Sequence, residues 1–148
     1  MKASKLFLTL VVSAMALVAF AAFGADKTIG GPKGGRLLEN QAPRAEFFVE
    51  KDRTVTIRFY DASLKAVPPG DQVVSAIAEP TSGKIKLEFE RKGDALVSKT
   101  PLPEGDGYNV VVQIKANADA KPQNFRIKFE THLCGECKRP EYACTCGH

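Results

Sequence analysis

The chain lacks tryptophan, and its two methionines, Met1 and Met15, both lie in the first 24 residues. No histidine precedes His132 and no cysteine precedes Cys134. Blue-copper geometry is excluded, because it needs histidines within the β-domain and usually an axial methionine. A serine or cysteine nucleophile would have to recruit a histidine from the C-terminal segment. We therefore expect that the protein is not an enzyme.

The chain also has only a small excess of positive over negative charge. The formal net charge is +4, and the loss of Lys2 and Lys5 with an N-terminal signal would reduce it by two, to +2. A charge this small gives no reason to expect nucleic acid or an anionic membrane surface as a partner. The composition, 44% hydrophobic and 26% charged, is close to the globular average, which argues against disorder of the whole chain.

Residues 1–24 have the pattern of an export signal. Lys2 and Lys5 precede an apolar stretch over residues 6–23, and Ala22-Phe23-Gly24 places small residues where a signal peptidase cuts, before Ala25. An uncleaved anchor is the alternative, and it would be the chain's only membrane contact. We expect cleavage and a periplasmic or secreted protein, in a compartment where paired thiols tend to form disulfides.

Residues 25–43 form a glycine-rich N-terminal arm. Its run Gly30-Gly31-Pro32-Lys33-Gly34-Gly35-Arg36 is not a phosphate-binding P-loop, because the lysine precedes the second glycine pair and no Ser or Thr follows it. We expect a flexible arm, with Leu37 and Leu38 docking on the domain.

Residues 44–131 alternate between apolar and polar side chains, as strands with one buried face require. Gly and Pro mark the turns between these stretches. The pattern predicts an all-β fold: a single antiparallel β-sandwich of immunoglobulin-like kind with about seven strands, although the Cys-Trp-Cys core of a true immunoglobulin domain is missing. The expected strands lie at 45–50, 54–59, 72–78, 84–90, 95–98, 109–115 and 124–130.

Residues 132–148 hold every cysteine and histidine of the chain, in the pattern H-x-C-x2-C-x6-C-x-C-x-H. A C-x2-C turn commonly brings two thiolates to one side of a metal ion, and four thiolates make a closed tetrahedral zinc site. The C-x-C half suits Cu(I) somewhat better. We predict a metal site in which Cys134, Cys137, Cys144 and Cys146 are thiolate ligands, with His132 and His148 as auxiliary ligands.

Three other interpretations of this segment remain open. The cysteines can form disulfides that staple the tail, with cross-pairing between the two halves easier than a strained Cys144–Cys146 bridge. A structural zinc knuckle can order the C-terminus and do nothing else. A redox pair is the third, but the helix N-terminus that lowers a thiol pKa in such motifs is missing from the sequence pattern.

Several stretches, among them 31–38, 45–49 and Glu141-Tyr142-Ala143-Cys144-Thr145-Cys146, resemble a group of small, uncharacterised exported bacterial β-domain proteins with a C-terminal cysteine motif. The resemblance implies an association with heavy-metal efflux systems. Relatives often carry histidines near the first two stretches, whereas Lys33 and Arg44 stand here, so it implies no second metal site at the N-terminus. It transfers no catalytic residue.

These observations together predict a periplasmic metal-binding accessory protein. Its β-sandwich would display a tail that captures Cu(I) or Zn(II) and hands the metal to an efflux adaptor or pump. The alternative is a non-catalytic structural or interaction module whose cysteines are cross-linked or hold a purely structural zinc.

Overall fold

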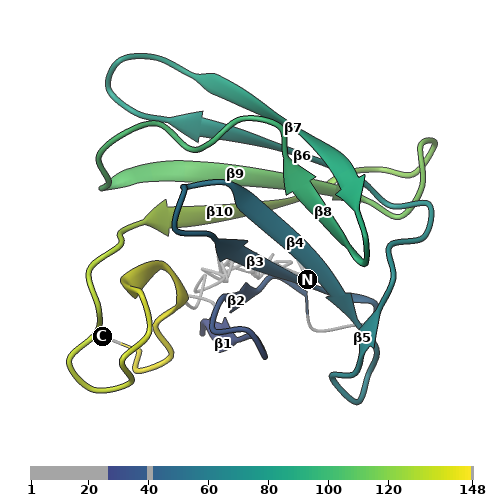
Figure 1. Ribbon diagram of the computed structural model, residues 1–148, viewed down its shortest axis with the longest axis horizontal. Helices are drawn as coiled ribbons and strands as arrows, with labels where there is room; N and C mark the ends of the chain where they lie inside the picture. Colours follow the sequence, from purple (N-terminus) through teal and green to yellow (C-terminus); the bar gives the residue numbers. More distant parts are fainter. Residues whose placement is uncertain (1–26, 40–41, 148) are drawn as a thin grey trace, which may run out of the picture.

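The computed structural model describes residues 27–39 and 42–147, and this part of the chain is all-β (Figure 1). The expected signal segment, residues 1–24, and His148 lie outside the described residues. No helix within the described ranges reaches the length and apolarity that crossing a membrane requires. The elements are β1 (Ile29–Gly30), β2 (Arg36–Leu37), β3 (Arg44–Val49), β4 (Val55–Tyr60), β5 (Ala66–Val67), β6 (Val73–Glu79), β7 (Ile85–Lys92), β8 (Ala95–Ser98), β9 (Tyr108–Lys115), β10 (Gln123–Phe129) and the 3-10 turn η1 (Glu141–Ala143).

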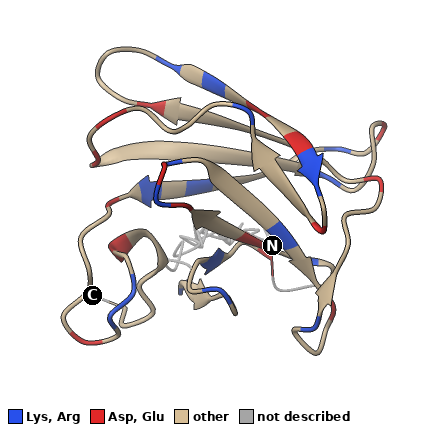
Figure 2. Ribbon diagram, in the orientation of Figure 1, with Lys and Arg blue, Asp and Glu red and all other residues tan. Residues whose placement is uncertain are grey.

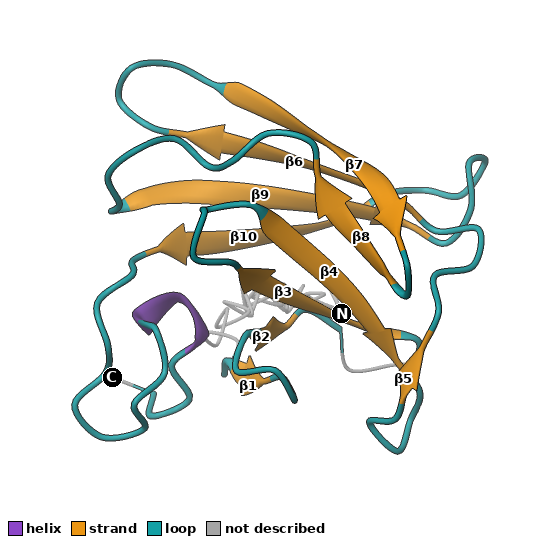
Figure 3. Ribbon diagram, in the orientation of Figure 1, coloured by secondary structure: helices purple, strands orange, loops and turns teal. Residues whose placement is uncertain are grey.

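All strands pair antiparallel in one curled sheet, a half-barrel, in the order β1-β2-β3-β4-β8-β7-β6-β9-β10, with β5 beside β4. β7 changes partner half-way along its length. Its residues 85–88 pair with β6 and its residues 89–92 pair with β8, so that it belongs to both halves of the sheet (Figure 3). A strand that changes partner in this way turns the corner between two packed layers.

The prediction of an all-β antiparallel fold is confirmed, while the finer prediction differs from the structure in two respects. The strands form one continuous curled sheet rather than two separate sheets of a sandwich, because β7 joins the halves. The described strands number ten rather than about seven. The seven with four or more residues coincide with the expected segments, and the other three have two residues each, too short for an alternating pattern to reveal.

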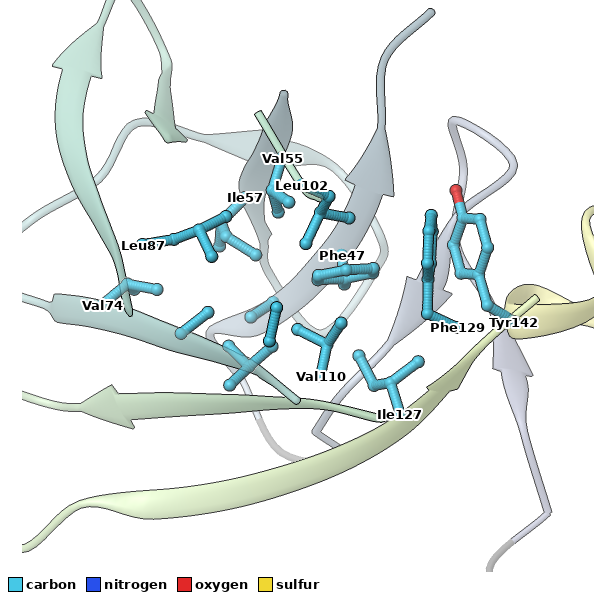
Figure 4. Packing of buried hydrophobic residues seen from close by; sticks show 14 of the residues in the cluster. Phe47, Val55, Ile57, Val74, Leu87, Leu102, Val110, Ile127, Phe129 and Tyr142 are labelled. Atoms are coloured by element: carbon cyan, nitrogen blue, oxygen red, sulfur yellow. The ribbon is translucent and has the colours of Figure 1, made fainter. Parts of the chain in front are cut away.

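The core fills the concave side of the sheet, where the predicted alternation places it. Phe47, Ile57, Val110 and Ile127 come from β3, β4, β9 and β10, and all four are completely buried (Figure 4). Side chains at every second position of these strands face this interior. At one end the rings of Phe129 and Tyr142 lie side by side, so the core extends beyond the last strand into η1.

The N-terminal segment is an edge of the sheet rather than a flexible arm. β1 and β2 form a hairpin, and β2 pairs with β3. Leu37 is buried and Leu38 packs against the core, so the expected docking of these two leucines is confirmed. The glycine-rich turn between the two strands lies over β3, where its fit depends on the absence of side chains: a Cβ on Gly35 would come within 2.2 Å of the Phe47 carbonyl oxygen.

The C-terminal segment also packs on the sheet instead of trailing from it. The N–H of Tyr142 donates to the carbonyl of Glu130, just beyond β10, and its hydroxyl accepts from the N–H of Val49 at 3.1 Å. Tyr142 and Ala143 are buried members of the core cluster. The segment that carries the cysteines is therefore anchored between β3 and β10, beside the N-terminal hairpin (Figure 1).

Candidate metal centre

The structure brings all four cysteines of the chain together. The Sγ atoms of Cys134, Cys137, Cys144 and Cys146 lie within 4.8 Å of one another, although Cys134 and Cys146 are 12 residues apart. The separation is 3.6 Å between the sulfurs of Cys134 and Cys146, and 3.7 Å between those of Cys137 and Cys144. Each close pair joins one cysteine of the C-x2-C motif to one of the C-x-C motif.

These separations match the edges of a tetrahedral metal site. Four sulfurs at about 2.3 Å from a central zinc ion are about 3.8 Å apart. A disulfide bond would instead place two sulfurs at about 2.05 Å. The cysteines are thiols in this structure, and their spacing fits a thiolate-bound cation.

Backbone hydrogen bonds shape the first half of the site. The N–H of Cys134 donates to the carbonyl of Arg139, while the N–H of Lys138 donates back to the carbonyl of Cys134. Leu133 and Pro140 form an isolated β-bridge that closes the base of this loop. The two cysteines of C-x2-C thus stand on a tight loop closed by the backbone itself.

Each half of the motif ends in a residue with left-handed backbone. Lys138 follows Cys137 with a φ of 57°, and Gly147 follows Cys146 with a φ of 71°. A left-handed residue reverses the chain, and after the first cysteine pair this turns the N–H of Arg139 back toward the sulfur of Cys137. Glycine adopts this conformation without strain, whereas lysine does so at a cost.

Peptide N–H groups point at the sulfurs and favour their ionised form. Those of Thr145 and Arg139 donate to Cys137 and lower the pKa of its thiol, while the N–H of Cys146 donates to Cys144 at 3.4 Å. Burial and the neighbouring thiols raise the pKa of Cys146. For Cys144 the N–H of Cys146 has the largest single effect and lowers the pKa, but burial and the neighbouring thiols together outweigh it, so the pKa is raised. Four thiolates so close together repel one another, and a bound cation would offset that repulsion.

One side of the cluster is buried and the other is accessible. Cys134 and Cys144 are buried, with 4% and 8% of their surface exposed, and Cys137 and Cys146 are half-buried. Every close pair therefore joins a buried sulfur to an accessible one. Such a site holds an ion against the domain and still presents two ligands to solvent.

Of the two predicted histidines, His132 is described by the structure and is not part of the sulfur cluster. His132 is outside the group of potential metal ligands, and its Nε2 lies 3.8 Å from Glu141 Oε2, with 66% of its side chain exposed. His148 lies outside the described residues. The four cysteines alone make up the site that the structure places together.

Arg139 connects this site to the N-terminal hairpin, a role that the spacing of the cysteines did not reveal. Its guanidinium donates from Nη1 to the carbonyls of Gly31 and Gly35, both at 3.3 Å. Its own backbone holds Cys134 and Cys137 in place. One residue thus bonds the cysteine loop to the glycine-rich turn.

The same turn encloses the carboxylate of Glu46, which is completely buried. Lys33 and Gly35 donate their N–H groups to Oε1 at 3.0 and 2.9 Å, and the Tyr60 hydroxyl donates to Oε2 at 2.6 Å. Burial and this contact with Glu46 raise the pKa of Tyr60. The turn binds an anion through its peptide N–H groups, and the anion is a side chain of its own chain.

Comparison of the chain with protein-family models, curated proteins and solved structures finds no match. The association with heavy-metal efflux systems therefore stays a prediction from sequence resemblance. The structural basis for a function is the geometry of the cysteine cluster.

Proposed function

We propose that this protein is a non-catalytic, exported metal-binding protein that holds one soft cation through Cys134, Cys137, Cys144 and Cys146. The observation that carries the proposal is the clustering of four sulfur atoms within 4.8 Å, with spacings close to those of a four-thiolate site. Their donor chemistry selects Zn(II) or Cu(I) over hard cations such as Mg(II) or Ca(II).

Zinc is the ion that fits this arrangement best. A closed set of four thiolates at tetrahedral spacing is typical of Zn(II), whereas Cu(I) favours fewer ligands. The N–H groups that point at Cys137 and Cys144 would share the negative charge that four thiolates leave on a zinc site.

Metal capture and transfer require that ligands exchange, and the accessible side of the cluster supports this. An incoming thiolate from a partner can reach the sulfurs of Cys137 and Cys146 while the buried pair keeps the ion in place. We propose the periplasm as the compartment and an efflux adaptor or pump as the receiver of the metal, on the strength of the N-terminal signal pattern and the sequence resemblance.

A purely structural zinc is the second candidate, and the packing of the cysteine segment favours it. Tyr142 and Ala143 lie between the two cysteine motifs and belong to the core. A metal that orders this segment would also close one end of the half-barrel. The two functions differ in how fast the ion exchanges and in how much stability it supplies.

Titration of the reduced protein with Co(II), a spectroscopic substitute for Zn(II), tests metal binding directly. We expect visible bands of tetrahedral thiolate coordination that saturate at one ion per chain. Cys144→Ser should weaken those bands and shift them to shorter wavelength, because one thiolate is lost, and the control His132→Ala should leave their position and stoichiometry unchanged, because His132 lies apart from the cluster. Unshifted bands in Cys144→Ser, or a shift in His132→Ala, would contradict the proposed ligand set.

Competition with a chelator then separates the two candidates. A transfer protein should release Zn(II) to a thiol-containing chelator within seconds to minutes and keep a folded sheet, since none of the described strands contains a ligand. Release that requires unfolding of the sheet would favour the structural zinc.

A further inference from the structure

The open side of the half-barrel forms a cleft of about 1530 Å³. The cleft separates the two edges of the sheet, since β1 and β2 line one wall and residues 123–126 of β10 line the other. Half-buried Leu38 and Phe125 pack at its base against the core, and Ile29 is 42% exposed at its wall. This volume exceeds the usual 300–1,000 Å³ of a small-molecule site.

β10 presents its backbone to this cleft. Four consecutive residues line the wall, which side chains on one face of a strand cannot do because they alternate. Within the described residues β9 is the only strand that pairs with β10. The carbonyl of Phe129 accepts from Gly107, next to β9, whereas the carbonyl of Glu130 accepts from Tyr142 on the opposite side. Backbone groups alternate along a strand, so those of Asn124 and Arg126 point into the cleft.

The charges around the cleft are mainly positive. Among the described residues, Lys27, Arg36, Lys121 and Arg126 line it, against one acidic residue, Glu39. Glu79 neutralises Arg126 through an ion pair of 2.6 Å, but Lys27 and Lys121 have no acidic counterpart in the lining apart from Glu39. β10 carries two basic residues, Arg126 and Lys128, of which only Arg126 lines the cleft, while Lys128 pairs with Glu130 (Figure 2). The field in the cleft therefore favours an anionic occupant.

We propose that this cleft binds an extended acidic segment of a partner protein, which adds to β10 as the next strand. The open N–H and C=O groups of Asn124 and Arg126 supply the pairing. Alternate side chains of the added strand would face the apolar interior beside Phe125 or the basic rim beside Lys121. An acidic-apolar alternation matches both, and the added strand continues the sheet toward β1.

The cleft also reaches the cysteine site. Thr145 lines the cleft, and its N–H donates to the sulfur of Cys137. A bound strand would thus lie next to the metal loop, a suitable position for a protein that receives the ion. Strand binding itself requires only β10 and the basic rim, so it is testable separately from metal transfer.

Two synthetic peptides test the proposal by amide hydrogen exchange and NMR titration of the purified protein. One is a blocked hexapeptide that alternates glutamate with valine, and the other replaces each glutamate with lysine. We expect the acidic peptide to slow exchange of the Asn124 and Arg126 amides at least about tenfold at saturation, because amides that are open in the free protein become hydrogen-bonded to the peptide. The basic peptide should leave both amides unchanged.

Variants of the edge distinguish strand pairing from general charge attraction. Asn124→Pro removes the N–H that points into the cleft and keeps the pairing with β9, so it should weaken binding about fivefold or more, while Asn124→Ala retains the N–H and the affinity. Lys121→Glu should weaken binding of the acidic peptide by a similar factor and keeps the proposal testable if the proline variant fails to fold.

Three outcomes would overturn the proposal. The two peptides can bind equally, the exchange rates of Asn124 and Arg126 can stay constant while other residues respond, or both amides can be protected without peptide by self-association, detected by sedimentation. A protein that binds Co(II) but not the acidic peptide would overturn this proposal without affecting the proposed metal site.

Discussion

Arg139 donates from its guanidinium to the carbonyl oxygen of Gly35 at 3.3 Å, across 104 residues of sequence. The contact joins the cysteine loop to the glycine-rich turn. The same nitrogen also donates to the carbonyl oxygen of Gly31 at 3.3 Å. Gly31 in turn lies against the buried Glu46 side chain, since a Cβ on Gly31 would lie 2.2 Å from the carboxyl carbon. These contacts therefore link the metal site directly to the N-terminal edge of the sheet.

Arg139→Ala should weaken metal binding about tenfold, the lower end of what the loss of groups that orient metal ligands commonly costs. The backbone bonds of Arg139 to Cys134 and Cys137 remain in this variant, so the expected loss comes from the loop between Cys137 and Pro140, which no longer has its anchor on the glycine turn. The measurement is competition between the protein and a chromophoric chelator for Zn(II). Lys86→Ala is the control, because it removes an exposed cation on β7, away from the cysteine loop, and should leave affinity within about twofold. Equal losses in both variants would contradict the anchoring role.

Glu46→Gln should destabilise the protein by about 1.5–3 kcal/mol, because two N–H groups and the Tyr60 hydroxyl donate to a fully buried carboxylate. An amide carries two N–H donors of its own, and one of them would face these donors. Urea denaturation measures the difference. Glu88→Gln, an exposed position in a salt bridge with Lys99, should change stability by less than about 0.5 kcal/mol. A glutamine variant as stable as the original chain would show that the turn does not need the charge.

Tyr142 provides a graded test of the link between the core and the cysteine segment. Tyr142→Phe removes the hydroxyl that accepts from Val49 and should cost about 1 kcal/mol. Tyr142→Ala also removes the ring contacts with Phe47 and Phe129 and should cost about 3 kcal/mol. Thermal unfolding of the zinc-loaded protein gives both values. Only the alanine variant should lower metal affinity, since only it detaches η1 from the core; equal affinities in all three proteins would refute that link.

Asp106 should make stability depend on pH in the acidic range. The backbone and side chain of Thr131 donate to its carboxylate, at 3.1 and 3.0 Å, and lower its pKa below the ordinary 3.8. A group with a depressed folded-state pKa stabilises the fold above its unfolded value and loses that contribution as the pH falls through the folded pKa. Asp106→Asn should therefore be less stable than the original chain at pH 5, and the gap should narrow as the pH falls below 3.8. Melting curves of both proteins across this range supply the test, and a gap independent of pH would contradict it.

The alternation of apolar residues was enough to locate the seven longer strands, because burial of one face imposes a period of two. It misassigned Glu46, which has a polar residue's place in the pattern but lies completely buried under the glycine turn. The alternation pattern depends only on the polarity of each residue along the strand. The turn that covers Glu46 comes from a segment 11 residues earlier with little apolar content, so the pattern could not predict that Glu46 is buried. The continuous sheet was missed for a similar reason, since the change of partner within β7 leaves no mark on its alternation.

The four cysteines of the candidate site followed from spacing alone, because C-x2-C and C-x-C constrain their sulfurs locally. The anchoring of that site did not. Arg139 is one of many basic residues in the sequence, and its role depends on the glycine carbonyls that the fold brings to it. Tyr142 likewise lies in the C-terminal segment of the sequence, and only the structure shows that it belongs to the core.

Native mass spectrometry of the protein released from its own compartment without reductant, paired with a thiol count after denaturation, tests the central claim. The account predicts the mass of the chain plus one metal ion, and four alkylatable cysteines once that ion is removed. A metal-free chain lighter by four hydrogens, with the cysteines joined in two disulfides, would contradict it.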